Sequence, residues 1–252
     1  MPTLNNRFRA LAATLAIGAL GAGFSTAAGA LATYNATSAL AITLDSVSGP
    51  GWVGDASGLN DGELTTESGV ASNAYTLVSP EFFNTPIVIG QPYGMDAASY
   101  GNASDGYAAS EAYAELGISI FNPTGGSLTF DFSYTGLIDA AVTGDLAAGE
   151  AADAYAALTM FDDLFLVDIF EQVEANLDPS LGFPLLDSLP ISGTFSVTLA
   201  SGDFDFITTY LDTRGSATGV PAAPPAAPEP ASIALLAAGL IGVGAARRRK
   251  SA

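Results

Sequence analysis

Two stretches in the middle of the chain alternate apolar and polar residues one by one, and this alternation restricts the fold more than any other feature of the sequence. The even-numbered positions of Ala112–Phe121 are all apolar, and those of Leu128–Thr135 are Leu, Phe, Phe and Tyr. Successive side chains of a strand point to opposite faces, so each stretch predicts a strand with one buried and one solvated face. The turn-forming residues Asn122–Gly126 lie between them and predict a β-hairpin.

A similar pair of stretches follows nearer the C-terminus. Gly193–Leu199 alternates in the same way, Ala200–Asp203 supplies a turn, and Phe204–Leu211 returns as the second arm of a predicted hairpin. Leu40–Val47 is a further predicted strand, and it ends at a Ser-Gly-Pro-Gly turn. Short strands about ten residues apart, with turn residues between them, are typical of antiparallel sandwiches. We therefore predict a mainly β fold, an antiparallel β-sandwich of jelly-roll or immunoglobulin-like type over residues 33–215.

Other parts of the body give weaker patterns. Gly51–Gly69 and Gln91–Ser110 are rich in glycine and small residues, and we expect loops there. Ala151–Met160 is compatible with a strand or a helix. The spacing of apolar residues in Phe161–Leu177 fits both the helical and the strand period. The alternation in the surrounding sequence favours a strand that covers Leu164–Phe170.

Charge is distributed very unevenly along the chain. Six of the seven basic residues lie near the two ends. Between Thr33 and Pro228 the chain therefore has one basic residue, Arg214, and 25 acidic residues. This stretch has a formal charge near −24, which repels nucleic acid and anionic lipid. The acidity is typical of a solvated exported surface, and it also favours cations and neutral or cationic polymers. Nucleic acid is therefore not an expected partner.

The residue types that are missing exclude several kinds of chemistry. The chain has no His and no Cys, which excludes Ser-His-Asp and Cys-His catalysis, disulfides and the usual zinc sites. Lys250 is the only lysine and belongs to the C-terminal segment, so a lysine nucleophile is not expected either. Carboxylate chemistry is the remaining class, and a glycosidase needs two suitably spaced carboxyl groups. The adjacent pair Asp162 and Asp163 would point to opposite faces of a strand. We expect no enzyme, no catalytic residue and no cofactor other than a candidate Ca²⁺.

Two acidic groups are candidate Ca²⁺ ligands, because Ca²⁺ prefers carboxylate and carbonyl oxygens. Asp55, Asp61 and Glu63 lie in the predicted loop Gly51–Gly69, although their spacing does not match the EF-hand pattern. Asp203 and Asp205 are two residues apart, so on a strand they would share a face. In both places the alternative is an ordinary solvated surface.

The N-terminal segment 1–32 has the features of a secretory signal peptide. Arg7 and Arg9 precede an apolar stretch, Ala10–Gly23, whose length suits the hydrophobic region of such a signal. Small residues at Ala30 and Ala32 predict cleavage before Thr33, and cleavage after Ala30 is the alternative. An uncleaved N-terminal helix that anchors the chain is a further alternative.

The C-terminal segment 228–252 has three parts in a fixed order. Pro228-Glu229-Pro230 is followed by an uncharged stretch, residues 231–246, and then by four cations, Arg247, Arg248, Arg249 and Lys250. The uncharged stretch predicts a transmembrane helix slightly shorter than the usual ~20 residues. Cations are unfavourable within a bilayer, so these four would stay in the cytoplasm and stop transfer. Residues 216–227, rich in Pro and Ala, predict an extended linker.

This arrangement resembles the PEP-CTERM sorting signal of proteins exported by Gram-negative bacteria. The resemblance covers Pro228–Lys250 and implies that exosortase processes the chain near Pro228, Glu229 and Pro230. It also implies a protein that is anchored transiently in the inner membrane and then reaches the cell surface or the extracellular matrix. An unprocessed tail anchor is the alternative.

Together these observations predict an exported structural protein of the surface or of an exopolysaccharide-associated biofilm matrix. Its expected partners are signal peptidase, exosortase and the membrane during export, with exopolysaccharide as a candidate afterwards. The alternative is a Ca²⁺-dependent carbohydrate-binding or adhesion module. A carboxylate-based glycosidase is the third hypothesis.

Overall fold

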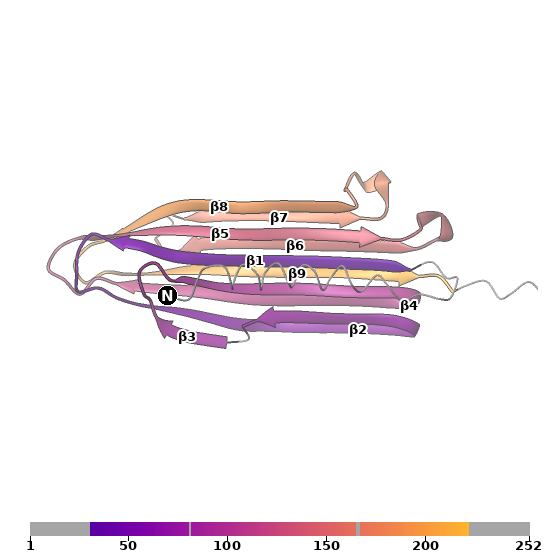
Figure 1. Cartoon of the computed structure of the whole chain (residues 1–252), viewed down its shortest axis with the longest axis horizontal. Coiled ribbons are helices and arrows are strands. Elements are labelled where there is room, and N and C mark those ends of the chain that lie inside the picture. Colours follow the sequence, from indigo (N-terminus) through magenta and orange to yellow (C-terminus); the bar gives the residue numbers. More distant parts are fainter. Residues whose placement is uncertain (1–30, 81, 165–166, 222–252) are drawn as a thin grey trace, which may run out of the picture. The chain divides into compact units, whose positions relative to one another are not determined.

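The structure is a computed structural model that describes residues 31–80, 82–164 and 167–221 (Figure 1). Two short 3₁₀ turns, η2 (Leu146–Ala148) and η3 (Pro179–Leu181), accompany nine strands. The strands are β1 (Ala32–Val47), β2 (Val53–Ser79), β3 (Phe82–Pro86), β4 (Pro92–Phe121), β5 (Leu128–Thr143), β6 (Ala151–Asp162), β7 (Asp168–Asn176), β8 (Leu186–Leu199) and β9 (Phe204–Gly219). Among these residues, none forms a helix with the length and apolar character that crossing a membrane requires. The predicted signal helix and C-terminal transmembrane helix lie outside the described residues.

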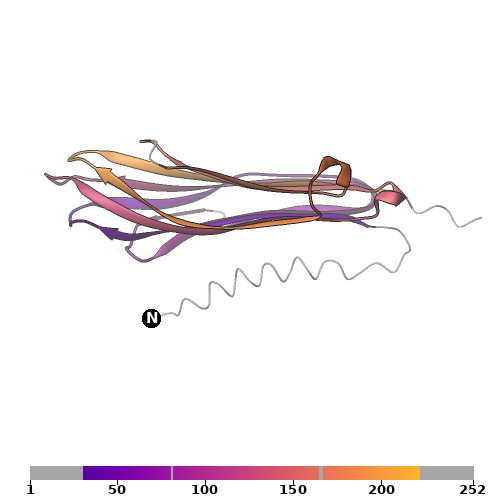
Figure 2. The same ribbon diagram turned by 90° about the horizontal axis from the view of Figure 1, so that it is seen from above.

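All nine strands belong to one antiparallel sheet with the order β7-β6-β9-β4-β1-β5-β8, and β2 pairs with β3 and β4. Some strands contact one another without sharing hydrogen bonds: β1 packs on β6 and β9, and β5 packs on β6 and β7. The sheet therefore folds back on itself into two layers (Figure 2). The first layer holds β8, β5, β1 and the first half of β4, and the second holds β7, β6, β9 and the second half of β4.

Two long strands, β2 and β4, run through both layers. Pro92–Ala103 of β4 pairs with β1, and Gly106–Phe121 pairs with β9, so β4 reverses direction between these two parts. β2 bends beside it at Gly69. Gly69 and Gly106 have φ values of +93° and +115°, and a Cβ on either one would come within 2.1 Å of the other strand's backbone. Glycine is required at both positions, since no other residue combines this conformation with so close an approach.

The bend of β2 and β4 defines one end of the body, which we call the arch end. The opposite end, the turn end, holds the connections β1–β2, β4–β5 and β8–β9. Asn122 joins two of these connections, because its buried side-chain amide donates to Gly126 O, Leu199 O and Ala200 O at 2.7 to 3.0 Å. Its side-chain oxygen accepts a hydrogen bond from Thr124 N.

The interior changes composition from one end to the other. In the half next to the arch end, the arch half, the buried residues are mainly alanines: Ala32, Ala36, Ala103, Ala108, Ala112, Ala140, Ala152, Ala154 and Ala217. In the half next to the turn end, the turn half, they are large: Ile42, Leu44, Leu116, Ile118, Ile120, Phe130, Phe132, Met160 and Ile207. Trp52 packs edge-on against Phe130 there, with the ring centroids 6.0 Å apart.

The prediction of a mainly β, antiparallel body is confirmed. The strands form one continuous folded sheet in place of the two separate sheets of a jelly-roll or immunoglobulin-like sandwich. Both predicted hairpins are wrong, because β4 does not pair with β5 and β8 does not pair with β9. In each case the short turn crosses from one layer to the other, so the two strands lie in different layers.

Some predicted boundaries also differ from the structure. The expected loops Gly51–Gly69 and Gln91–Ser110 are strand, because they belong mostly to β2 and β4, where lateral pairing outweighs the low strand propensity of Gly and Ala. Residues 151–162 form strand β6, and β7 begins at Asp168, four residues later than predicted. β9 extends to Gly219, so the first residues of the predicted linker 216–227 belong to the sheet.

Candidate functional site

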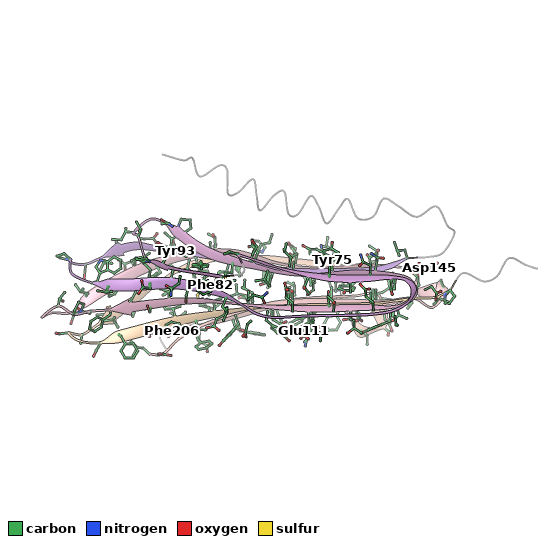
Figure 3. All side chains as sticks on the ribbon, turned by 90° about the horizontal axis from the view of Figure 1, so that it is seen from below. Tyr75, Phe82, Tyr93, Glu111, Asp145 and Phe206 are labelled. Atoms are coloured by element: carbon green, nitrogen blue, oxygen red, sulfur yellow. The ribbon has the colours of Figure 1, made fainter. Side chains whose placement is uncertain are left out.

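The outer face of the second layer carries a shallow pocket of about 310 Å³ near the arch end. Four strands contribute to it: β2, β4, β6 and β9. We call it the tyrosine pocket, and its lining residues are Leu64, Thr66, Tyr107, Ala109, Ser110, Glu111, Asp153, Arg214, Gly215 and Ser216. Figure 3 shows Glu111 on the outer side of its layer, opposite the layer that carries Tyr75.

Strand register explains why a hollow forms here. Thr66, Ala109, Ser216 and Asp153 are neighbours across four strands, because Thr66 pairs with Ala109, Ala109 with Ser216, and Ser216 with Asp153. The side chains of Ala109 and Ser216 are short, so the middle of this row is low. Ser216 donates a hydrogen bond to Asp153 Oδ1, which holds the carboxylate at the end of the row.

Taller side chains form the two walls of the hollow. Tyr107 is 37% exposed and lies two residues before Ala109 on β4, on the same outer face. It forms the wall on that side of the low row. On the other side, Glu111 pairs with Arg214, and Arg214 pairs with Tyr155. The low row between these walls therefore runs across the strands.

Arg214 is held by an aromatic ring. Its guanidinium carbon lies 4.3 Å from the centroid of the Tyr155 ring, within the range of a cation–π interaction. Arg214 is exposed, and no other basic residue occurs between Thr33 and Pro228.

The surrounding acids and phenols influence one another. Burial raises the pKa of Asp212 to about 6, Arg214 opposes this increase, and Glu111 adds to it. Burial, together with a hydrogen bond donated to Glu111, raises the pKa of Tyr113. Burial and the charge of Asp212 also raise the pKa of Tyr155. These tyrosines therefore stay neutral at physiological pH.

The sequence predicted a candidate Ca²⁺ loop at Asp55, Asp61 and Glu63, and the structure places these residues along strand β2. Asp55 pairs with Ser119, Glu63 pairs with Ala112, and Asp61 falls at a bulge between them. Within the described ranges, no group of three or more acidic side chains is arranged to hold a metal ion. The loop expected to wrap a cation is therefore an extended strand.

Asp203 and Asp205 were predicted to share a strand face, and this prediction is wrong. Asp203 is exposed in the turn that precedes β9, whereas Asp205 is fully buried at the start of this strand. Its neighbour is Asp162 on the paired strand β6, which is also fully buried. Asp205 Oδ1 accepts a hydrogen bond from Phe206 N, and Asp162 Oδ1 accepts one from Val167 N. Burial and the nearby Asp162 raise the pKa of Asp205 to about 6.

Asp162 and Asp163 are separated as the strand pattern predicted. Asp162 points into the interior, and Asp163 is exposed just after the end of β6. The proximity of Asp162 and Asp205 could not be predicted from the sequence, because the two residues are adjacent only through the pairing of β6 with β9.

The tyrosine pocket was also not predicted. Its residues come from four strands, and Arg214 was noted only as the lone cation of the body. The one sequence signal that points to it is the combination of this cation with exposed tyrosines at odd-numbered positions of β4, Tyr107 and Tyr113. Their grouping depends on strand register, which the sequence pattern does not specify.

A family model described as the PEP-CTERM protein-sorting motif matches residues 226–250. Pro228, Glu229, Pro230 and the cations Arg247–Lys250 fall within this match, although all lie outside the described residues. The predicted resemblance is therefore confirmed: the chain carries a C-terminal sorting motif, consistent with an exosortase substrate. The predicted signal cleavage residue Ala30 also lies outside the described residues.

No curated protein matches the chain. Among solved structures, a secreted serine protease, VesC from Vibrio cholerae, is 8% identical over 67% of this chain, with a TM-score of 0.11. The chain spans 46% of the length of that protease. A similarity this low carries no argument about fold or function.

Proposed function

We propose that the chain is an exported, non-enzymatic protein that exosortase sorts and that acts as a structural or adhesive component of the cell surface or extracellular matrix. In this proposal signal peptidase removes the N-terminal segment. The C-terminal segment then holds the chain in the inner membrane until it is processed near Pro228, Glu229 and Pro230. The strongly acidic β body is the part that reaches the surface.

The observation that carries this proposal is the position of the sorting motif after the last strand. β9 ends at Gly219, and the matched motif begins at residue 226. Every strand of the sheet is therefore complete before the motif starts, so processing within the motif would leave the folded body whole. A sorting signal that overlapped β9 would instead remove pairing partners of β4 and β6.

The first strand supports the alternative cleavage position at the N-terminal end. Ala32 begins β1, is fully buried and pairs with Ala103. Cleavage before Thr33 would remove this residue from the sheet, whereas cleavage after Ala30 keeps it. We therefore propose Ala30 as the last residue of the signal peptide.

An adhesive role has a specific observation in its favour, the tyrosine pocket on the outer face of the second layer. This form of the proposal does not involve Ca²⁺, because Asp55, Asp61 and Glu63 are spread along β2. A carboxylate-based glycosidase has less support, because the buried carboxyls Asp162 and Asp205 face the interior and have no access to a sugar chain.

Intact-mass measurement of the protein recovered from the cell surface tests the proposal. We expect a chain that begins at Leu31 and ends near the Pro-Glu-Pro tripeptide. A variant with Pro228→Ala and Pro230→Ala should accumulate in the inner membrane with its C-terminus uncut. Pro221→Ala with Pro224→Ala, two changes just before the motif, is the matched control and should be processed normally.

Recovery of the intact chain from the cytosol would overturn the proposal. So would normal processing of the Pro228→Ala, Pro230→Ala variant. Incubation of the purified protein with polysaccharide from the producing cells should leave the length of the sugar chains unchanged. Shortened chains would contradict a non-enzymatic role.

A further inference from the structure

We propose that the tyrosine pocket is a binding site for an amine-bearing saccharide, a hexosamine unit with a free amino group within a sugar chain. This inference rests on the proposed function only in that export brings the body into contact with surface sugars. The site itself is argued from its shape, its rings and its charges.

The shape suits one or two units of an extended sugar chain. The hollow of about 310 Å³ is shallow, and its low row runs from Thr66 through Ala109 and Ser216 to Asp153. A chain lying along this row would cross the strands between two walls. The walls would contact its faces, and the ends of the row would stay open for further units.

The walls offer the two surfaces that a sugar ring needs. A pyranose has an apolar face of C–H groups and a rim of hydroxyls. Tyr107 presents an exposed ring to the apolar face and a phenol to the rim. The ring of Tyr155 already holds Arg214, so the guanidinium is fixed in place and its N–H groups can donate to sugar oxygens.

The charges select an amine. Glu111 and Asp153 line the hollow together with a single cation, Arg214, and Asp212 pairs with Tyr113 in the adjacent row. A negatively charged sugar would be repelled by these carboxylates and by the charge of the whole body. An ammonium group beside Asp153 or Glu111 would make a charge-assisted hydrogen bond, which is stronger than one between neutral groups. The charge complementarity therefore favours a cationic unit over a neutral or acidic one.

Isothermal titration calorimetry of the full chain with short sugars tests the site. The probes are a glucosamine tetramer with free amines and its fully N-acetylated counterpart, both at about 0.15 M salt, where long-range charge effects are screened. We expect the free-amine tetramer to bind at least roughly tenfold more tightly, since one charge-assisted hydrogen bond is enough for that difference.

Three variants distinguish the pocket from the general acidity of the body. Asp153→Asn removes a carboxylate from the low row, and Tyr107→Ala removes one wall. Each should weaken binding of the free-amine tetramer by roughly tenfold or more. Asp61→Asn removes one exposed charge from the same layer outside the pocket and should change the affinity by less than about twofold. Thermal melting of each variant checks that the fold is retained.

Equal affinity for the two tetramers would overturn the choice of an amine-bearing sugar. Equal weakening by Asp61→Asn and Asp153→Asn would show attraction to the overall charge, with no specific site. Absence of heat with either probe would exclude saccharide binding in the pocket. None of these results changes the intact mass or the location of the protein, so the sorting proposal and the site proposal fail separately.

Discussion

The arch half and the turn half of the body are built from the same two layers, yet they pack in different ways. In the arch half the buried side chains are mostly alanine, and in the turn half they are Ile, Leu, Met and Phe. Figure 2 shows the layers lying close together towards one end and spreading apart towards the other. The size of the buried side chains therefore sets the separation of the layers. Ordinary packed sheets are ~10 Å apart, and alanine allows a closer approach.

The close approach in the arch half permits hydrogen bonds from one layer directly to the other. Ser38 donates to Ala157 O at 3.0 Å, and Ser99 donates to Thr213 O at 2.9 Å. Tyr34 and Ser110 share a hydrogen bond of 2.7 Å between their hydroxyl groups. Alanine contributes little hydrophobic free energy per residue compared with Phe or Ile. Inter-layer hydrogen bonds and close backbone contacts stabilise this half, whereas hydrophobic burial stabilises the turn half.

The largest effect is expected from removal of a large side chain in the turn half. Phe130 is fully buried and contacts Trp52, so Phe130→Ala should reduce the free energy of unfolding by about 3–5 kcal/mol. Urea denaturation measures this change. Met160→Leu, which nearly conserves volume at another buried position of the same half, should cost less than ~1.5 kcal/mol. A loss below ~1 kcal/mol for Phe130→Ala would show that the turn half is not stabilised by tight apolar packing.

The opposite change tests the arch half. Ala112 is fully buried between the layers, so Ala112→Leu adds volume where the layers are closest. Overpacking of this kind should destabilise the protein by about 1–3 kcal/mol. Chemical denaturation measures the free energy of unfolding of Ala112→Leu, which adds volume, and of Ala112→Gly, which removes a methyl group. The comparison distinguishes the effect of excess volume from the effect of losing the methyl group. An unchanged or increased stability of Ala112→Leu would mean that the arch half has free space.

Removal of one inter-layer hydrogen bond should have a smaller effect. Ser99→Ala leaves Thr213 O without its side-chain donor and should cost about 0.5–1.5 kcal/mol. Ser196→Ala, on the exposed outer face of β8, is a matched control that should cost less. Equal losses for the two variants would argue against hydrogen bonding between the layers as a source of stability.

A pH titration of a single variant tests the buried carboxyl Asp205 of the turn half. Burial raises the pKa of Asp205 to about 6 from its usual 3.8, so the folded protein holds this proton more tightly than the unfolded chain does. The contribution of this group to stability is therefore greatest below pH 4, decreases as the pH rises through 6, and is constant above that. Asp205→Asn should flatten the pH dependence and raise the urea midpoint at pH 7 relative to the parent. A steeper pH dependence of the variant would contradict this assignment.

Several elements could be predicted from the sequence because they depend on short-range pattern alone. The strands around Phe130, Ile118 and Val197 follow from one-by-one alternation, which a helix does not produce. Their partners could not be predicted in this way. A short turn such as Asn122–Gly126 can close a hairpin or cross between layers, and the choice depends on residues as distant as Leu199, whose carbonyl accepts a hydrogen bond from Asn122.

Two regions of low strand propensity also show that strand pairing cannot be predicted from the local sequence. Gly51–Gly69 and Gln91–Ser110 resemble loops in composition, and both belong mostly to the longest strands of the sheet. Pairing on both sides of β4 supplies hydrogen bonds that local propensity does not register. The tyrosine pocket depends on this pairing as well, since Arg214, Glu111 and Tyr155 become neighbours only through the register of three strands.

The sequence by itself determined the sorting motif, the acidity of the body and the antiparallel β character, because each is a property of neighbouring residues or of composition. Only the tertiary structure decided the reversal of β2 and β4, the taper from alanine to large side chains, and the grouping of Arg214 with the tyrosines. These features arise where strands distant in sequence pair in one register. A shift of that register by a single residue would turn every outward side chain inward.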